Sequence, residues 1–281
     1  MISTVTVNFK TADYVETMLE SLFKYHNPEE VEVFVVENGS GDDLSKLTTK
    51  FPQVNFIFSN QNLGFARGCN LAIEQARGEV IALINPDIVF TSNSLKQIEQ
   101  KMKQDADVGV AGVSLKNVDG SQQNCVWHFS RPIDQLLVLL KAPHLFKHLK
   151  SVEYWRWLDF DYSRTQDVDQ VMGAFFAIKR ELLNAIGPLD PGFFIWYEEV
   201  DYCRRAANAG WKIRYYADIG AQHKGGSSFD RVLTIQKQKV IRQSLRRYMK
   251  KHHGSIWGFI FTALNPLFVI LALIASVIKP K

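Results

Sequence analysis

The sequence predicts an α/β protein whose helices flank a mostly parallel central sheet, and three observations support this class. Short apolar stretches alternate with amphipathic helical stretches at regular spacing over residues 1–115. Polar residues gather directly after the expected strands, where open α/β sheets hold their ligands. The 281 residues are 46% hydrophobic and 22% charged, which is typical of a globular chain with a large core and not of a disordered one.

Hydrophobic periodicity places the elements of the first half. Residues 2–9 alternate and are rich in β-branched side chains, and residues 81–84 form an uninterrupted apolar run typical of a buried central strand. The expected strands are 2–9, 31–36, 54–58, 81–84 and 108–115, and the expected helices are 11–25, 44–50, 69–76 and 94–104.

The regular alternation ends after Gly120. The aliphatic segment 132–150 is expected to be one helix, and a core helix, an interfacial amphipathic helix and a mobile acceptor flap are all compatible with it. His223 lies in the expected loop 220–227, and a lone histidine is more often structural than a metal ligand. The other elements expected here are a strand over 171–180, a helix over 181–186, a helix that begins near Glu198 and a strand over 211–216.

Polar residues follow four strands of the expected parallel sheet. They are Asn8, the turn 37–43, the loop 60–70 and the triplet Asn85-Pro86-Asp87. Because the carboxyl ends of parallel strands meet at one edge, we expect these four loops to converge. Asp87 could hold a divalent cation against an anionic ligand there, although Asn-Pro-Asp taken alone is more often a plain turn. No G-x-G-x-x-G or Walker A sequence is present, which argues against a standard dinucleotide or P-loop site.

An acidic cluster, Glu198, Glu199 and Asp201, follows the apolar run Phe193–Tyr197. Carboxylates in the first turn of a helix are stabilised by its dipole, and this capping role would explain them without any chemistry. Alternatively, mutual repulsion and partial burial would raise the pKa of one carboxyl group, which suits a general base.

The three cysteines, Cys69, Cys125 and Cys203, form neither a disulfide framework nor a metal motif, so a reducing cytosolic setting is expected. The N-terminus does not have the pattern of a signal peptide.

The net charge of +4 is unevenly distributed, because the last acidic residue is Asp230 and basic residues follow it. This asymmetry indicates an anionic partner, a membrane surface or nucleic acid, near the C-terminus. Residues 254–278 then carry no charge, and as one helix they would be about 37 Å long, enough to cross a hydrocarbon core of about 30 Å. Asn265-Pro266 interrupts the segment, so a kinked span, a re-entrant hairpin and a soluble core helix remain alternatives.

Eight motifs in order make the chain resemble the family 2 glycosyltransferases of the Rossmann-like GT-A fold, in particular the rhamnosyltransferase-like branch. The resemblance covers about residues 1–250. The motifs are Thr4-Val-Thr-Val-Asn8, Val35-Val-Glu37-Asn38-Gly-Ser40, Asn62-Leu-Gly64-Phe-Ala-Arg-Gly68-Cys-Asn70, Leu83-Ile-Asn85-Pro-Asp87, Gly173-Ala-Phe, Leu189-Asp190-x-x-Phe-Phe, Glu198-Glu199-Val-Asp201-Tyr-Cys-x-Arg205 and His223-x-Gly-Gly-Ser227.

The resemblance implies a role for each matched position. Asp87 would bind Mg²⁺ or Mn²⁺ on the diphosphate of a nucleotide sugar, with His223 completing the site and Asn85 beside it. Glu199 would be the catalytic base with Glu198 as its neighbour. The nucleoside and sugar would contact residues of the strand-end loops, namely Asn8, Glu37, Asn62, Gly64 and Arg67. The donor and acceptor pocket would include Gly173 and Asp201 of the later motifs, and Trp196, which lies between two of these motifs.

Two positions depart from the family pattern, because Glu37 and Glu199 stand where the family usually has Asp. Each side chain is one methylene longer, which changes its reach but keeps the carboxylate. The resemblance implies an inverting, metal-dependent transfer in which Glu199 deprotonates the acceptor hydroxyl, with an oxocarbenium-like transition state.

The sequence is therefore interpreted as a membrane-associated glycosyltransferase of bacterial surface-glycan synthesis. Residues 1–115 would bind the nucleotide sugar, residues 116–250 would hold the catalytic and acceptor groups, and residues 251–281 would attach the protein to the cytoplasmic face of the membrane. The expected donor is dTDP-rhamnose, with UDP- or GDP-sugars as alternatives. The acceptor would be a glycan or a polyprenyl-linked glycan, and no nucleic-acid partner is expected. A non-catalytic membrane-tethered nucleotide-sugar- or glycan-binding protein and a sugar nucleotidyltransferase are the alternative functions.

Overall fold

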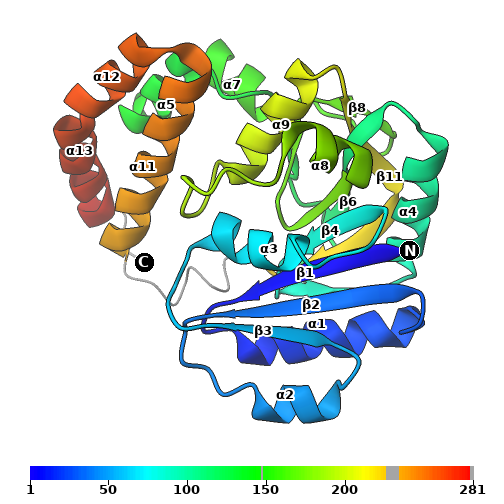
Figure 1. Cartoon of the computed structure of the whole chain (residues 1–281). Coiled ribbons are helices and arrows are strands. Elements are labelled where there is room, and N and C mark those ends of the chain that lie inside the picture. Colours follow the sequence, from blue (N-terminus) through cyan, green and yellow to red (C-terminus); the bar gives the residue numbers. More distant parts are fainter. Residues whose placement is uncertain (147, 226–233, 279–281) are drawn as a thin grey trace.

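The computed structural model of the chain describes residues 1–146, 148–225 and 234–278 (Figure 1). Residues 226–227 of the histidine motif and residues 279–281 of the predicted tail lie outside these ranges.

A mixed nine-stranded sheet forms the centre of the molecule, with the order β3-β2-β1-β4-β10-β6-β11-β5 and β8 paired to β11. Its first four strands are mutually parallel, whereas β10 runs antiparallel to both of its neighbours. The strands of this sheet are β1 (Ile2–Asn8), β2 (Val31–Asn38), β3 (Asn55–Ser59), β4 (Val80–Ile84), β5 (Ile88–Val89), β6 (Val108–Lys116), β8 (Gln166–Val168), β10 (Phe175–Lys179) and β11 (Lys212–His223). A separate small sheet pairs β7 (Val126–Trp127) with β9 (Gln170–Val171).

Helices cover both faces of this sheet, as the α/β class predicted. In Figure 1, α3 lies on one side of β1 and β2 and α1 lies on the other side. The helices are α1 (Ala12–Tyr25), α2 (Ser45–Lys50), α3 (Phe65–Ile73), α4 (Ser94–Gln104), α5 (Pro132–Leu139), α6 (Ala142–Leu145), α7 (Lys150–Arg156), α8 (Arg180–Ile186), α9 (Glu198–Asn208), α11 (Thr234–His253), α12 (Ser255–Ala263) and α13 (Asn265–Ile278). The main core is continuous from β1 to β11 and joins the two halves of the chain.

The prediction of one helix over 132–150 is wrong. The segment breaks into α5, α6 and the start of α7, because Lys141 takes a left-handed backbone conformation (φ 60°) and Pro143 follows in the first turn of α6. Proline lacks the backbone N–H that a continuous helix would use, so the chain turns at this point.

Three other predicted boundaries also moved. The helix predicted over 69–76 begins earlier, at Phe65, directly after Gly64. The strand predicted over 171–180 is divided between β9 and β10, with Gly173 in the break. β11 continues to His223, which pairs with Ile88 of β5, so the histidine ends a strand and does not lie in a loop.

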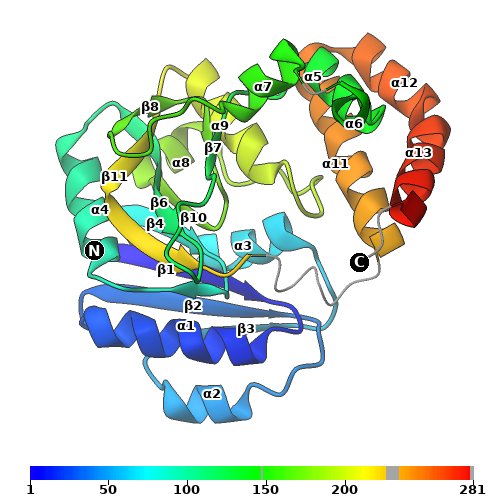
Figure 2. The same cartoon turned by 180° about the vertical axis from the view of Figure 1, so that it is seen from behind.

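The C-terminal helices pack on the body through a second apolar cluster. Figures 1 and 2 show α11, α12 and α13 forming an arch at one end of the molecule, beside α5. The cluster joins side chains from the segment before α9 and from α9 itself to the three helices of the arch: Phe193, Val200, Leu245, Tyr248, Met249, Phe261 and Phe268. The boundary predicted at residue 250 falls inside α11.

The carboxylate of Asp201 fixes α11 to α9. It is 0% exposed, and it accepts hydrogen bonds from His252 Nε2 (2.7 Å) and Arg205 Nε (2.9 Å). Lys251 Nζ lies 2.7 Å from its Oδ1. Burial would raise the pKa of Asp201, but the bonds from His252 and Lys251 outweigh burial and leave the pKa below its ordinary value. The negative charge is therefore kept inside the protein.

Within the described residues no single helix is both long and apolar enough to cross a bilayer. Taken together, α12 and residues 265–274 of α13 reach the length and hydropathy of a span, but they are bent by 46° at their junction.

The substitution Asp201→Asn should destabilise the protein by about 3 kcal/mol, because it removes the buried carboxylate that pairs with Arg205 and Lys251 and leaves these cations without their counter-charge. Urea unfolding monitored by circular dichroism measures this loss. Asp218→Asn is the matched control, since its carboxylate is 55% exposed and pairs with an exposed Lys101, and it should change stability little. Equal effects of the two substitutions would contradict the anchoring role of Asp201.

Candidate functional site

The carboxyl ends of the parallel strands bring the predicted loops together. Asn8 at the end of β1 is in register with Glu37 of β2, and the next residue of β2, Asn38, is in register with Ser59 of β3. The Asn85-Pro86-Asp87 triplet begins directly after β4, which is the other neighbour of β1. The convergence of the four loops at one edge of the sheet is therefore present in the structure.

Three of the predicted nucleoside-binding side chains shape their own loops. Asn8 Oδ1 accepts from Thr11 N–H (3.2 Å), and its Nδ2 donates to Asp42 (3.0 Å). Glu37 accepts from the backbone N–H groups of Gly39 and Ser40, each at 2.8 Å. These bonds hold the turn after β2 in a defined shape.

Asn62 belongs to the same kind of scaffold. Its Oδ1 accepts from Asn38 Nδ2 (3.2 Å) and from Gly64 N–H (2.9 Å), so it fixes the loop that leads into α3. A nucleoside would therefore meet a pre-organised loop, and contacts to backbone groups become as important as contacts to these side chains.

Gly64 and Arg67 connect the loop before α3 and α3 itself to the segment before α9. Phe65 N–H donates to Phe194 O (2.6 Å), and Arg67 Nε donates to Pro191 O (3.0 Å). A Cβ on Gly64 would lie 2.4 Å from Phe194 O, and Gly64 has φ +82°. Only glycine allows the two backbones to approach this closely.

Asp87 and His223, the two predicted metal ligands, lie side by side. Asp87 Oδ1 is 3.3 Å from His223 Nε2, and both residues are 6% exposed. The pairing of β5 with β11 produces this contact, because His223 is in register with Ile88, the residue after Asp87. Two positions 136 residues apart in the sequence thus meet at the strand ends.

The chemistry of this pair fits a divalent cation. His223 Nδ1 lies 2.7 Å from Gln123 Oε1, an acceptor, so Nδ1 carries the proton and the lone pair of Nε2 points toward Asp87. A lone pair and a carboxylate oxygen at this distance repel each other unless a proton or a cation lies between them. Within the described residues, however, no three His, Cys, Asp or Glu side chains cluster. A cation here would take its other ligands from diphosphate oxygens and water.

The predicted base lies close to this edge. A Cβ on Gly173 would lie 3.6 Å from Cβ and Cγ of Glu199, so this glycine leaves open space beside the carboxyl group. The next residue, Ala174, accepts a hydrogen bond from Asn85 N–H (2.9 Å). The Asn85-Pro86-Asp87 triplet and the acidic helix α9 are therefore joined through two consecutive residues, Gly173 and Ala174.

The chain enters α9 through two strained residues. Trp196 (φ 62°) and Tyr197 (φ 70°) both take left-handed backbone conformations, which are costly for residues with a Cβ. Tyr197 OH donates to Gln135 Oε1 of α5 (3.2 Å), and Ser244 Oγ of α11 donates to Ile195 O (2.8 Å). Contacts from two other helices therefore hold this turn and set the position of Glu198 and Glu199.

Burial dominates the electrostatics of the two glutamates. It raises the pKa of Glu198, and the charge of Glu199 raises it further. Burial also raises the pKa of Glu199, although backbone N–H groups at the start of α9 oppose the increase. One oxygen of each carboxyl group has no hydrogen-bond partner among the described residues. Glu198 is 5% exposed, whereas Glu199 is partly exposed as a residue, although its Oε2 is itself buried.

Asp201, predicted for the donor and acceptor pocket, has protein partners on both carboxylate oxygens. Its ion pairs with Arg205, Lys251 and His252 hold α9 to α11.

Sequence reasoning missed two groups at this edge. Gln123 sets the tautomer of His223 from an irregular segment that carries no sequence motif. Lys224 follows His223, and its N–H donates to Asp87 O (3.1 Å) while its Nζ donates to Tyr14 OH (2.7 Å). A basic residue directly after the motif histidine was the available signal, since a cation at this edge suits a diphosphate.

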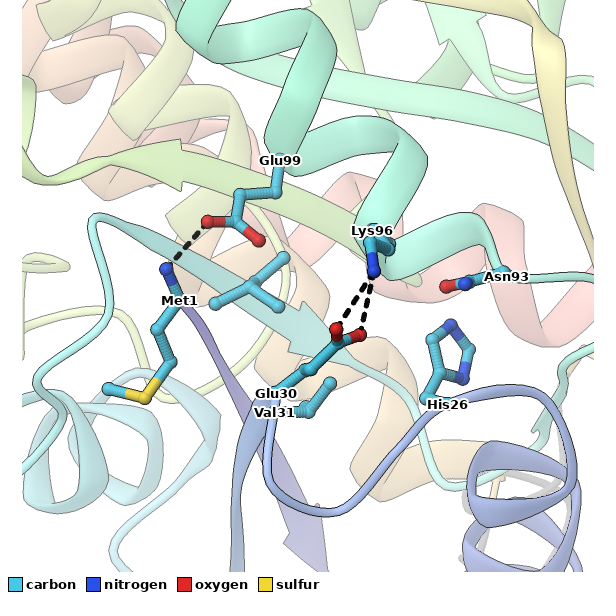
Figure 3. Close-up of a pocket in the computed structure, with 8 residues that line it drawn as sticks. Met1, His26, Glu30, Val31, Asn93, Lys96 and Glu99 are labelled. Carbon is cyan, nitrogen blue, oxygen red and sulfur yellow. Dashed lines mark hydrogen bonds and ion pairs between the residues drawn. The ribbon is translucent and has the colours of Figure 1, made fainter.

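A cavity of ≈ 300 Å³ lies at the opposite end of the sheet (Figure 3). It is lined by Met1, Ile2, His26, Glu30, Val31, Asn93, Lys96 and Glu99. Figure 3 shows that its charged groups already pair with one another, Met1 N with Glu99 and Lys96 with Glu30. It lies at the amino ends of β1 and β2, about 20 Å along β1 from Asn8. It is therefore separate from the strand-end site.

Comparison with known proteins agrees with this geometry. The family model described as "Glycosyl transferase family 2" matches residues 3–187, which is well over half of the chain. The chain belongs to glycosyl transferase family 2. The matched residues include every strand-end loop and Gly173, whereas α9, His223 and the C-terminal helices of this family member lie beyond the match.

Two curated relatives and one solved structure show which glycosyltransferases this chain is similar to. It is 21% identical to the low-salt glycan biosynthesis hexosyltransferase Agl10 of Haloferax volcanii, over 79% of this chain and 66% of that protein. It is 22% identical to the N-acetylglucosaminyl-diphospho-decaprenol L-rhamnosyltransferase of Mycobacterium tuberculosis, over 81% of this chain and 77% of that protein. The chain thus spans about two thirds to three quarters of these relatives. The mannosyltransferase PcManGT from Pyrobaculum calidifontis was solved with GDP-Man and Mn²⁺, and its structure matches this one with a TM-score of 0.55 at 16% identity. The match covers all of this chain and 76% of the PcManGT chain. This likeness confirms the predicted GT-A fold.

The substitution Gly64→Ala should destabilise the protein by about 1–3 kcal/mol more than Gly120→Ala does. Both glycines have a similar positive φ, but a Cβ on Gly120 would meet nothing within 4 Å. Urea unfolding of the two variants measures the difference. A Gly64→Ala variant as stable as Gly120→Ala would contradict the close packing of α3 on the segment before α9.

As the pH rises above about 5, the Glu198→Gln variant should become progressively more stable relative to the unsubstituted protein. The folded-state pKa of Glu198 is raised, so folding binds a proton that the unfolded chain releases near its ordinary pKa of 4.5. Stability is therefore greatest below that value and decreases as the pH rises toward the folded-state pKa. Glutamine does not titrate, and it removes this decrease. Thermal midpoints at pH 4.5, 6 and 8 test the expectation, with the more exposed Glu199→Gln as a control of smaller effect. A pH-independent difference would show that the pKa of Glu198 is not raised in the folded protein.

Proposed function

We propose that this family 2 member transfers a sugar from a nucleotide-sugar donor to an acceptor hydroxyl with inversion of the anomeric configuration, in the synthesis of a bacterial surface glycan. One observation carries the proposal: a buried carboxylate–imidazole pair, Asp87 and His223, and the Glu199 carboxyl group of raised pKa lie at the same edge of the sheet. Asn85 N–H bonds to Ala174 O, and the neighbouring Gly173 lies against Glu199, so a short backbone connection links the two. A transfer reaction needs both groups at once, one at the leaving diphosphate and one at the attacking hydroxyl.

In this mechanism Glu199 is the general base. It removes the proton from the acceptor hydroxyl as that oxygen attacks the anomeric carbon, and no covalent enzyme intermediate forms. Gly173 leaves room beside its carboxyl group, and the start of α9 directs backbone N–H groups toward it. Glu198 keeps its proton more firmly, since it is more deeply buried and beside Glu199.

Asp87 and His223 would hold Mg²⁺ or Mn²⁺. When bound, such a cation offsets the negative charge that develops on the departing nucleoside diphosphate. Lys224, next to His223, supplies a further positive charge from the chain itself. The presence of Mn²⁺ with GDP-Man in the PcManGT structure supports this part of the proposal.

The donor we propose first is dTDP-rhamnose, because one relative is a rhamnosyltransferase whose name gives a decaprenol-linked acceptor. UDP- and GDP-sugars are the alternatives, and the GDP-Man of PcManGT represents the second class. A lipid-linked acceptor would place the enzyme at the cytoplasmic face of the membrane, and the basic, acid-free C-terminal helices support this location.

The decisive measurement is nucleoside diphosphate release by the purified protein with dTDP-rhamnose, UDP- and GDP-sugars, each with Mg²⁺, Mn²⁺ or EDTA. Glu199→Gln should lower turnover by about 10²–10⁴-fold. The donor-induced thermal shift should remain, because this side chain is not needed to bind the nucleotide. The rate of the unsubstituted protein should rise with pH through a pKa above the ordinary 4.5, since the base acts when ionised.

Glu181→Gln is the control, because Glu181 is an exposed glutamate on α8, and it should keep normal turnover. Near-normal turnover of Glu199→Gln with an intact fold would refute the base assignment. A donor-induced thermal shift without turnover under any condition would favour the non-catalytic binding protein. Release of inorganic pyrophosphate from a nucleoside triphosphate and a sugar phosphate would favour the nucleotidyltransferase.

A further inference from the structure

Large apolar side chains are exposed at one end of the molecule, on two segments far apart in the sequence. Leu145 is 78% exposed, Ile256 is 76% exposed and Phe259 is 72% exposed. The exposed apolar residues of segment 132–146 are Ile133, Leu140, Leu145 and Phe146, and those of α12 and α13 are Ile256, Phe259, Leu267, Ile270, Leu273 and Ile274. We call these two groups together the apolar end.

The two segments pack on each other. α5 contacts α13, and Leu136 and Leu139 of α5 pack on the cluster that contains Phe261 and Phe268. Figures 1 and 2 both show α5 and α6 beside the arch of α11, α12 and α13. The inward side chains of the segments therefore hold them together, and the exposed ones lie on neighbouring elements at this end of the molecule.

The charges beside this surface are positive. Segment 131–150 contains one acidic residue, Asp134, which is buried and bonded to Arg131, and residues 234–278 contain none. Lys150 and Lys250 are exposed, and α12 crosses close to Lys250, since a Cβ on Gly258 would lie 2.7 Å from its Cβ. Glu153 of α7, which pairs with His148, is a partly exposed carboxylate near this surface. An apolar surface with exposed lysines on its own segments and no exposed carboxylate on them has the composition of an interfacial membrane-binding element.

We propose that the apolar end binds in the plane of an anionic bilayer, with α6, α12 and the outer side of α13 inserted into the headgroup and upper acyl region. The lysines at its border would contact anionic headgroups. Both segments are required, so the membrane contact is a composite of the tail and the 132–146 segment and not a property of the tail alone.

The structure disfavours a spanning segment. α12 has 9 residues and α13 has 14, so the helices are about 14 and 21 Å long, each shorter than a hydrocarbon core of about 30 Å. The 46° bend keeps them from acting as one rod. Phe261 and Phe268 are buried in the protein's own cluster, and a straight span would remove them from it.

The same charges disfavour a second copy of the chain as the occupant. Two such surfaces face to face would place lysines against lysines, with no exposed carboxylate on either segment to compensate. An anionic lipid surface supplies the missing negative charge.

This surface also explains how a lipid-carried acceptor would reach the base, a consequence that rests on the proposed function. Gln135 of α5 accepts a hydrogen bond from Tyr197, which directly precedes Glu198 and Glu199. The helix that borders the membrane surface therefore also borders the catalytic turn.

The test is flotation of the purified full-length protein with preformed vesicles of phosphatidylcholine, with and without phosphatidylglycerol, which requires no activity. The protein should float with the anionic vesicles, and less as salt is raised. The double variants Leu145→Ser/Phe146→Ser and Ile256→Ser/Phe259→Ser should each weaken binding by about tenfold or more. Phe58→Ser is the control, since Phe58 is 60% exposed on β3, away from the apolar end, and it should float normally.

Circular dichroism should show all variants folded, because the replaced side chains are exposed. Failure of the unsubstituted protein to bind anionic vesicles would overturn the proposal. Loss of binding in the Ile256/Phe259 variant alone would also overturn it, because the tail would then act by itself. A dimer in gel filtration that the same variants dissociate, without vesicle binding, would identify a second copy as the occupant.

Discussion

One cationic side chain of α11, Lys251, lies between two carboxylates that flank the turn before α9, and it adds an ionic constraint to the hydrogen bonds that hold this turn. Its Nζ is 2.7 Å from Asp190 and 2.7 Å from Asp201, the residues on either side of the strained turn and the two glutamates. Burial opposes ionisation of Asp190, but bonds from Lys251, Gly192 N–H and Arg247 lower its pKa to about 2. Both carboxylates therefore stay charged, and α11 holds the two ends of segment 190–201 through ion pairs. Charges held in a poorly hydrated position resist displacement, because separating them would leave an unpaired buried ion.

The polar groups at the strand ends fall into two kinds. Asn8, Glu37 and Asn62 direct their side chains to the backbone of their own or adjacent loops and give the site its shape. Glu198 and Glu199, in contrast, each keep a carboxyl oxygen without a partner among the described residues. An unpartnered buried oxygen costs free energy, and folded proteins keep such groups where they bind a ligand or transfer a proton. The hydrogen-bonded loops around the two glutamates prevent the site from rearranging to remove this cost. Glu37 belongs to the first kind, because both of its carboxylate oxygens accept from backbone N–H groups of its own turn.

The C-terminal helices have two roles that depend on opposite faces. Their inner face supplies Leu245, Tyr248 and Phe261 to the second apolar cluster, and it carries the cations that hold α9. Their outer face exposes the apolar side chains proposed to enter a bilayer. α11 contacts the turn before α9 and continues into α12 after a single residue, so the proposed membrane contact and the proposed catalytic residues would be mechanically connected. The C-terminal helices that make this connection lie outside the residues 3–187 that the family model matches.

The sequence by itself determined the parallel half of the sheet and the identity of the strand-end loops, because apolar runs and turn residues are local signals that act over a few positions. It also identified Asp87, Glu199 and His223, which the structure places at one edge. Only the tertiary structure decided that Asp201 is an anchor, since its partner His252 lies 51 residues away and no local pattern reports it. The same applies to His223, which β5 recruits into a strand, and to segment 132–150, whose apolar period continues through a break at Lys141 and Pro143. Hydrophobic periodicity indicates which side of an element is apolar and is expected to face a core. The residues that these side chains pack against are decided by the packing of elements that are distant in the sequence.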